Sequence, residues 1–169
     1  MKDCHYYENR FYHRVNLLYN YSIMKLNRRY IPTTLSKRDR TKQINAIQQT
    51  RKNYRRGIYQ NRPHLSSFHS RPSGHIAKAK RMYNIDSLQI TPELVKKTGC
   101  SNSSLQKIIE KGRGAYYSSG SRPNQTADSW AYARLASAIT GGPASRIDKD
   151  ILIKGCKPNS RALHRASLI

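Results

Sequence analysis

The sequence predicts a mainly α protein, in which a small helical domain follows a long basic arm that is partly extended and partly helical. Three observations predict this class. Several short segments start at a capping Ser or Thr and end at a glycine, as helices do. Apolar residues make up only 37% of the 169 residues. The first 84 residues carry 19 Lys and Arg against 3 Asp and Glu, whereas the remaining residues carry 13 against 6. Charge of that density opposes compaction, so the first half favours an arm over a packed core.

These observations divide the chain into five parts. We expect a Tyr- and Arg-rich extended arm (1–35), a basic helix (36–57), a linker (58–75), a small helical domain (76–156) and a basic tail (157–169). The linker is predicted from Pro63, Pro72 and Gly74. No rigid element fixes its histidines, so we expect no metal site at His64, His69 or His75.

The basic helix is predicted between Ser36 as N-cap and Gly57 as C-cap. Its apolar residues are too few to bury it against a core of its own. Its basic residues gather at its two ends, with almost no acids to balance them. Two interpretations remain open: a solvated helical face, or a helix that lies on phosphates or on an acidic protein surface. The lack of acids favours the second.

The helices of the small domain are predicted from their capping residues. We expect them over 76–85, from Thr91 to Gly99, from Ser101 to Gly112, from Pro123 or Thr126 to Ile139, and from Asp148 to Lys154. Proline at the first helical position and Glu93 in the first turn support the second of these. Trp130 is the expected core anchor, because the chain has few other large apolar side chains.

The second and third of these helices have the spacing of a helix-turn-helix around Gly99. In a DNA reader, the second helix would offer Asn102, Ser103 and Gln106 to base edges, since they are short polar side chains near a helix N-terminus. The alternative is a plain structural hairpin, because any helical pair with a glycine turn produces this pattern.

The string GRGAYYSSGSRPNQT is predicted to be a loop and has two interpretations. Backbone amides with Arg113 or Arg122 would grip an anion or a partner. Alternatively, the loop packs Tyr116 and Tyr117 onto the following helix. It lacks the lysine and the spacing of a nucleotide-binding P-loop.

The sequence gives little indication of a catalytic or metal-binding site. The carboxylates form no recognisable acid–base or metal pair, so we expect no enzyme, no cofactor, no metal and no small-molecule substrate. Cys4, Cys100 and Cys156 are odd in number and unrelated in spacing, which predicts reduced thiols. The run from Phe11 to Leu26 is too polar for a membrane span or a signal peptide, so we expect a soluble, non-secreted protein.

Contacts with a polyanion or an acidic partner are expected from basic side chains of the arm, the basic helix and the later loop. These are Arg28, Arg29, Lys37, Arg38, Arg40, Lys42, Arg51, Lys52, Arg55, Arg56 and Arg122.

A resemblance to known proteins extends from about Pro92 to Cys156. It rests on the strings KKTGCS, KGRGAYYSSGSRPNQTADSWAYARLASAITGG and IDKDILIKGC. This stretch resembles an uncharacterised domain of nucleocytoplasmic large DNA viruses, including phycodnaviruses and mimivirus-like viruses. A looser version is similar to segments of some tailed-phage proteins. Weaker similarity continues upstream through RYIPTTLSKRDRTKQI and HIAKAKRMYNI. The resemblance implies a viral origin and brings no established activity.

Resemblance and charge together favour a structural virion protein, a minor capsid or cement component that docks onto acidic surfaces of other capsid proteins. The alternative is a non-specific DNA-binding or genome-packaging protein, since viral DNA would meet the same charge. A helix-turn-helix regulator is the third hypothesis. The expected location is the virion, and the host cytoplasm or nucleus during assembly.

Overall fold

The computed structural model describes residues 26–168, and this part of the chain is mainly helical, as predicted. Its elements are η1 (Arg28–Tyr30), α2 (Lys37–Tyr54), α3 (Gly74–Tyr83), α4 (Pro92–Thr98), α5 (Asn102–Ser118), α6 (Ala127–Ile139), α7 (Pro143–Ile147), α8 (Lys149–Gly155) and α9 (Arg161–Ser167). The predicted arm falls largely on residues 1–25, outside the described residues. Its described end holds the short η1.

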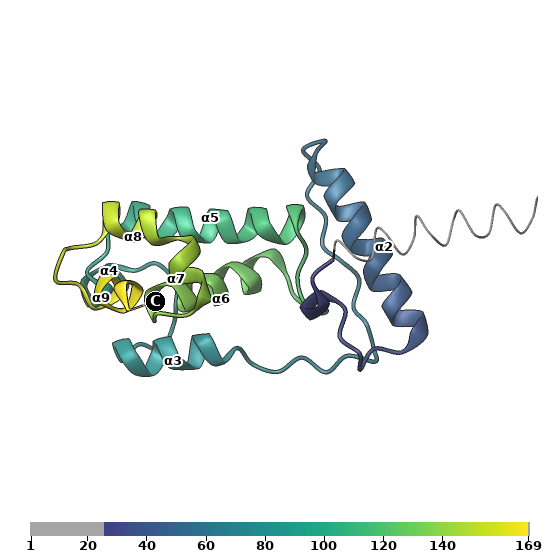
Figure 1. The fold of residues 1–169 in the computed structure, drawn as a ribbon, viewed down its shortest axis with the longest axis horizontal. Coiled ribbons are helices and arrows are strands. Elements are labelled where there is room, and N and C mark those ends of the chain that lie inside the picture. Colours follow the sequence, from purple (N-terminus) through teal and green to yellow (C-terminus); the bar gives the residue numbers. More distant parts are fainter. Residues whose placement is uncertain (1–25, 169) are drawn as a thin grey trace, which may run out of the picture.

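The core lies between α5 and α6, which run side by side through the middle of the molecule (Figure 1). Helix α3 packs against α6, and α8 and α9 close one end of the pair. Leu105, Ile108, Leu135 and Ile139 are fully buried there. Tyr83 links α3 to the end of α6, because its hydroxyl donates a hydrogen bond to the carbonyl oxygen of Ile139 at 2.5 Å. Burial raises the pKa of Tyr83 to about 12.

Local capping explains most of the helix starts. The side chains of Ser36, Thr91, Ser101 and Thr126 each accept a hydrogen bond from a backbone N–H in the first turn of their helix. These residues are the expected caps, and Gly99 ends α4 with a left-handed φ of +71°. The expected C-cap at Gly57 is wrong by two residues. Helix α2 ends at Tyr54 with Arg55 as its cap.

Helix α5 does not end at Gly112, and this prediction is wrong. The helix continues to Ser118, so the first part of the expected loop is helical. Gly112 is buried where α5 crosses α6, and a Cβ on it would lie 2.7 Å from the Cα of Ala131. The glycine therefore allows the two helices to approach closely rather than ending one of them.

The substitution Gly112→Ala should lower the free energy of unfolding by about 2 kcal/mol. Crowding against backbone lies at the upper end of the usual overpacking cost, about 3 kcal/mol. The better helix propensity of alanine offsets about 1 kcal/mol of this. Urea unfolding measures the difference. Gly114→Ala is the matched control, because its Cβ would meet only the Tyr54 hydroxyl at 3.5 Å. A loss of stability in both variants, or in neither, would contradict the close approach.

Trp130 is not the core anchor that we expected. It is only partly buried, and its ring lies edge-on to Tyr30 at a centroid distance of 5.9 Å. Among residues 26–168, the largest fully buried side chain is Tyr116, near the end of α5. Trp130 instead joins α6 to the segment that precedes α2.

The last part of the chain also departs from prediction. The expected basic tail contains α9, whose Ala162 and Ala166 are buried in the main core. Cys100 and Cys156 form a disulfide, so the prediction of reduced thiols is wrong for these two. Ser101 N–H donates to the Gly155 carbonyl at 2.7 Å beside the disulfide, which places the two cysteines next to each other. Cys4 lies outside the described residues.

Candidate nucleic-acid interface

Helix α2 stands across the end of the α5–α6 pair that is opposite α8 and α9 (Figure 1). Contrary to expectation, it buries an inner face. Ile44 and Ile47 pack with Leu26 in a second small core. Gln43 Nε2 donates to the carbonyls of Tyr30 (3.0 Å) and Ser121 (3.2 Å). Hydrogen bonds thus make up for the shortage of apolar residues.

Residues 58–73, which we call the strap, lie within the segment predicted as a linker but are held to the rest of the fold. Leu65 is buried, and the Asn124 side chain accepts from its N–H and donates to its carbonyl. The Arg62 guanidinium lies over the Tyr116 ring at 3.7 Å and donates to the Tyr116 carbonyl. Burial lowers the pKa of Arg62. Prolines indicated an irregular backbone, but these contacts order it.

The outer face of α2 is exposed along its whole length. A stripe at helical spacing consists of Arg38, Lys42, Asn45, Gln49 and Lys52. Residues three and four apart share one face of a helix, so these side chains form a single row. With a rise of about 1.5 Å per residue, the helix is roughly 27 Å long. Cations occupy both ends of the row and amides occupy its middle.

The only acid of α2 is turned away from this face. Asp39 is buried, and its Oδ2 accepts from the Ser67 N–H (3.0 Å) and hydroxyl (2.8 Å) of the strap. These two hydrogen bonds lower the pKa of Asp39, with smaller contributions from Lys42 and Arg38. Lys42 Nζ lies 3.8 Å from the other carboxylate oxygen, Oδ1, which is a long ion-pair contact. Apart from this contact with Lys42, the cations of the outer face are not ion-paired with the acid of the helix.

The structure separates the expected polyanion contacts into groups. Exposed at the two ends of α2 and in the following turn are Lys37, Arg38, Lys42, Lys52, Arg55 and Arg56. Arg28 and Arg29 are exposed on η1, and Arg122 is exposed in the loop before α6. Arg40 is partly buried. Arg51 turns inward, where its Nη2 donates to the Ser119 carbonyl at 2.6 Å.

Sequence reasoning missed Asn45 and Gln49, because on this helix it considered only the charged side chains as partner contacts. The signal was available: both fit the spacing of four, three, four and three residues that joins Arg38 to Lys52. Gln49 Nε2 donates to Asn53 Oδ1 at 2.9 Å, while the Asn45 side chain is exposed to solvent. Amide side chains are suited to hydrogen bonding with base edges, as well as with phosphates.

The loop before α6 provides hydrogen-bond acceptors for side chains of the same protein. The carbonyls of Ser119 and Ser121 accept from Arg51 and Gln43, and the Ser121 hydroxyl accepts from Arg62 at 2.5 Å. This arrangement holds cations of the same chain and presents carbonyl groups rather than a cradle of amides. Tyr116 and Tyr117 belong to α5, so they do not lie in the loop as expected.

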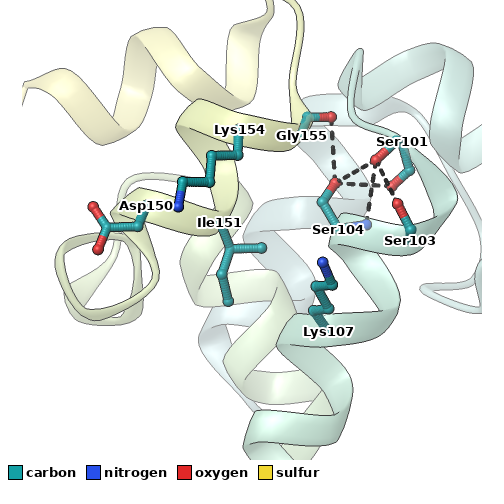
Figure 2. A pocket seen from close by; sticks show the side chains of 8 residues that line it. All are labelled: Ser101, Ser103, Ser104, Lys107, Asp150, Ile151, Lys154 and Gly155. Carbon is teal, nitrogen blue, oxygen red and sulfur yellow. Dashed lines mark hydrogen bonds between the residues drawn. The ribbon is translucent and has the colours of Figure 1, made fainter.

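The α4–α5 hairpin forms around Gly99, with Asn102 and Ser103 exposed at the start of α5. Gln106 is partly buried and donates to Glu110 Oε1 at 3.3 Å, so its amide is engaged within the helix. The negative charge of Glu110 on this face would repel a phosphate. Helix α8 packs beside the start of α5, and the Ser104 hydroxyl donates to the Gly155 carbonyl (Figure 2).

A pocket of about 280 Å³ lies between α5 and α8 (Figure 2). It is lined by Ser101, Ser103, Ser104, Lys107, Asp150, Ile151, Lys154 and Gly155. The three serine hydroxyls bond one another, at 3.1 Å and 2.9 Å. Because these groups already have partners, the geometry indicates no particular ligand.

Among residues 26–168, no group of His, Cys, Asp and Glu side chains is arranged to hold a metal ion. Within the same residues, none of the helices is long and apolar enough to cross a membrane.

Fold and surface together define a small helical protein with a basic, solvent-exposed helix at one end. Residues 22–152 match DUF5824, a family of unknown function, and the chain belongs to that family. No curated protein and no solved structure matches the chain. The family description names no activity.

Proposed function

We propose that this protein binds nucleic acid without sequence specificity, through the outer face of α2. The observation that carries the proposal is the uninterrupted exposed row on a helix whose single acid faces inward. The major groove of duplex DNA admits an α-helix, and cations at both ends of such a helix would meet phosphates on either side. The central amides would face the groove, where they can hydrogen-bond to phosphates or to any base edge. An acidic protein surface would require no such central row.

Salt-dependent affinity for duplex DNA tests the proposal. If six cations contact phosphates, affinity should fall roughly 10³-fold between about 50 and 200 mM salt. Two triple variants divide the face: Lys37→Gln with Arg38→Gln and Lys42→Gln, and Lys52→Gln with Arg55→Gln and Arg56→Gln. Each should reduce the slope of log affinity against log salt by about 3, since each lost phosphate contact removes about 0.9.

The matched control removes three exposed lysines elsewhere: Lys96→Gln, Lys149→Gln and Lys157→Gln. It makes the same change in net charge but should leave the slope near that of the unchanged protein. An equal loss in the control would mean that binding is the general behaviour of a polycation. Binding to polyglutamate as tight as binding to duplex DNA would favour an acidic protein partner instead.

A place in a virion is a second proposal, supported by the resemblance to proteins of large DNA viruses. In this role the protein would be a minor capsid or cement component, and assembly would take place in the host cytoplasm or nucleus. Mass spectrometry of purified virions tests it, after capsid shells have been separated from released genome. Association with shells would support the cement role, association with the genome would support the nucleic-acid role, and absence from virions would contradict both placements.

A further inference from the structure

Four tyrosines meet where α2 and α5 end, and we call them the tyrosine cluster: Tyr54, Tyr59, Tyr116 and Tyr117. Tyr54 and Tyr117 are stacked, with centroids 5.9 Å apart and planes 13° from parallel. Tyr59 lies edge-on to both, at 5.8 Å and 5.2 Å. Tyr116 lies edge-on to Tyr117 at 5.0 Å. Figure 1 shows the last turn of α2 beside the last turn of α5 at this point.

The tyrosine cluster runs from the core to the surface. Tyr116 is fully buried, Tyr54 and Tyr117 are partly buried, and Tyr59 is 66% exposed. Its neighbour Ile58 is 50% exposed. Two other rings hold the Tyr59 ring in place while much of its side chain faces solvent. It is therefore a preordered aromatic surface with room for a partner.

Positive charge lies on the α2 side of this surface. Arg55 and Arg56 are exposed in the turn between Tyr54 and Tyr59, and Lys52 lies one turn earlier. Arg113 lies one turn before Tyr117 on α5, and its Nε donates to Asp128 at 2.6 Å. Lys52, Arg55 and Arg56 continue the C-terminal end of the α2 outer face, whereas the charge of Arg113 is balanced by Asp128. An occupant that matches both properties has flat rings and negative charge.

We propose that the tyrosine cluster is a stacking site for unpaired bases of single-stranded nucleic acid, whose phosphates lie along Lys52, Arg55 and Arg56. The inference rests on the proposed function and adds a preference for single strands or unpaired ends. Bases in a duplex hide their faces against each other, whereas an unpaired base can lie on an aromatic ring. Surfaces that bind single strands combine aromatic platforms with a basic groove in this way.

Binding of the full chain to two oligomers tests the proposal: a short oligothymidylate, and an abasic oligomer of the same length and charge. Tyr59→Leu should weaken binding of oligothymidylate by roughly 5- to 140-fold, the usual effect of losing one base–aromatic stack. It should leave binding of the abasic oligomer unchanged. Tyr59→Phe keeps the ring and should bind both oligomers like the unchanged protein. Because Tyr59 is largely exposed, neither change should prevent folding, and urea unfolding checks this.

Equal affinity of the unchanged protein for the two oligomers would overturn the stacking site, and so would a Tyr59→Leu variant with no effect. If the Lys52, Arg55 and Arg56 triple variant still loses duplex affinity in that case, the proposed function stands and only this inference fails. If the triple variant and the Lys96, Lys149 and Lys157 control behave alike, the proposed function fails as well. Loss of polyglutamate binding in Tyr59→Leu would assign the tyrosine cluster to an acidic protein.

Discussion

Asp148→Asn should lower the free energy of unfolding by about 3 kcal/mol or more. This is the usual cost of removing one charged partner of a buried ion pair while the other partner stays buried. The Asp148 side chain is completely buried between α7 and α8. Arg134 of α6 donates to both of its oxygens, from Nε at 2.8 Å and from Nη2 at 2.7 Å. Lys111 of α5 approaches Oδ1 at 2.9 Å. One carboxylate at the α7–α8 junction thus joins this junction to two further helices, α5 and α6.

The neutral amide keeps the shape of Asp148 but removes the charge that balances Arg134. The side chain of Arg134 is only 15% exposed, so its guanidinium would remain largely buried without a counter-charge. Lys111 is 45% exposed and can turn to solvent, which limits the loss. Replacing Asp148 and Arg134 together by apolar residues of similar size should therefore cost less than Asp148→Asn alone.

Asp128→Asn provides the control for this prediction, since it makes the same change in net charge. Asp128 also pairs with an arginine, Arg113, at 2.6 Å, but its side chain is 62% exposed. We expect a loss of at most about 1 kcal/mol, because water screens exposed pairs. Urea unfolding of both variants gives the comparison. Equal losses would show that burial of Asp148 does not determine its contribution.

Removing the Cys100–Cys156 disulfide should lower the free energy of unfolding by about 4 kcal/mol. The disulfide closes a loop over a sequence separation of 56, and a loop of that length restricts the unfolded chain by about this amount. The loop contains α5, α6, α7 and α8, so the constraint acts across most of the main core. Cys100 and Cys156 are both buried, and the structure holds them together in the folded state.

Unfolding with and without a reductant measures this effect, and mass spectrometry of the intact chain checks that the two thiol hydrogens are absent before reduction. The variant with Cys100→Ala and Cys156→Ala should have the stability of the reduced protein and should not respond to reductant. If the unchanged protein contains the disulfide but unfolds at the same urea concentration after reduction, the expected constraint is absent.

Helix starts were predictable because a cap is a local interaction. The serine or threonine that accepts a hydrogen bond from the first turn lies within three residues of its donor, as at Thr91 and Thr126. Glycines were less informative. Gly99 adopts a positive φ and ends α4, whereas Gly112 lies inside α5 against Ala131. The sequence around each glycine does not contain the neighbouring helix that decides between these roles.

The candidate interface was predictable only in part. Charge at the two ends of residues 36–57 is visible in the sequence, and helical spacing places Asn45 and Gln49 between those ends. The inward turn of Asp39 depends on Ser67, which is distant in the chain. Arg51 turns inward for the same kind of reason, because the carbonyl of Ser119 accepts from it.

The sequence by itself determined the helical class, most of the capping residues and the concentration of positive charge before residue 85, because these follow from local chemistry and composition. Only the tertiary structure decided which side of α2 carries that charge outward and which glycines allow contact. It also decided that the strap is ordered, that Cys100 meets Cys156, and that four tyrosines gather beside the exposed arginines. Each of these depends on contacts between distant parts of the chain, and periodicity and spacing do not record such contacts.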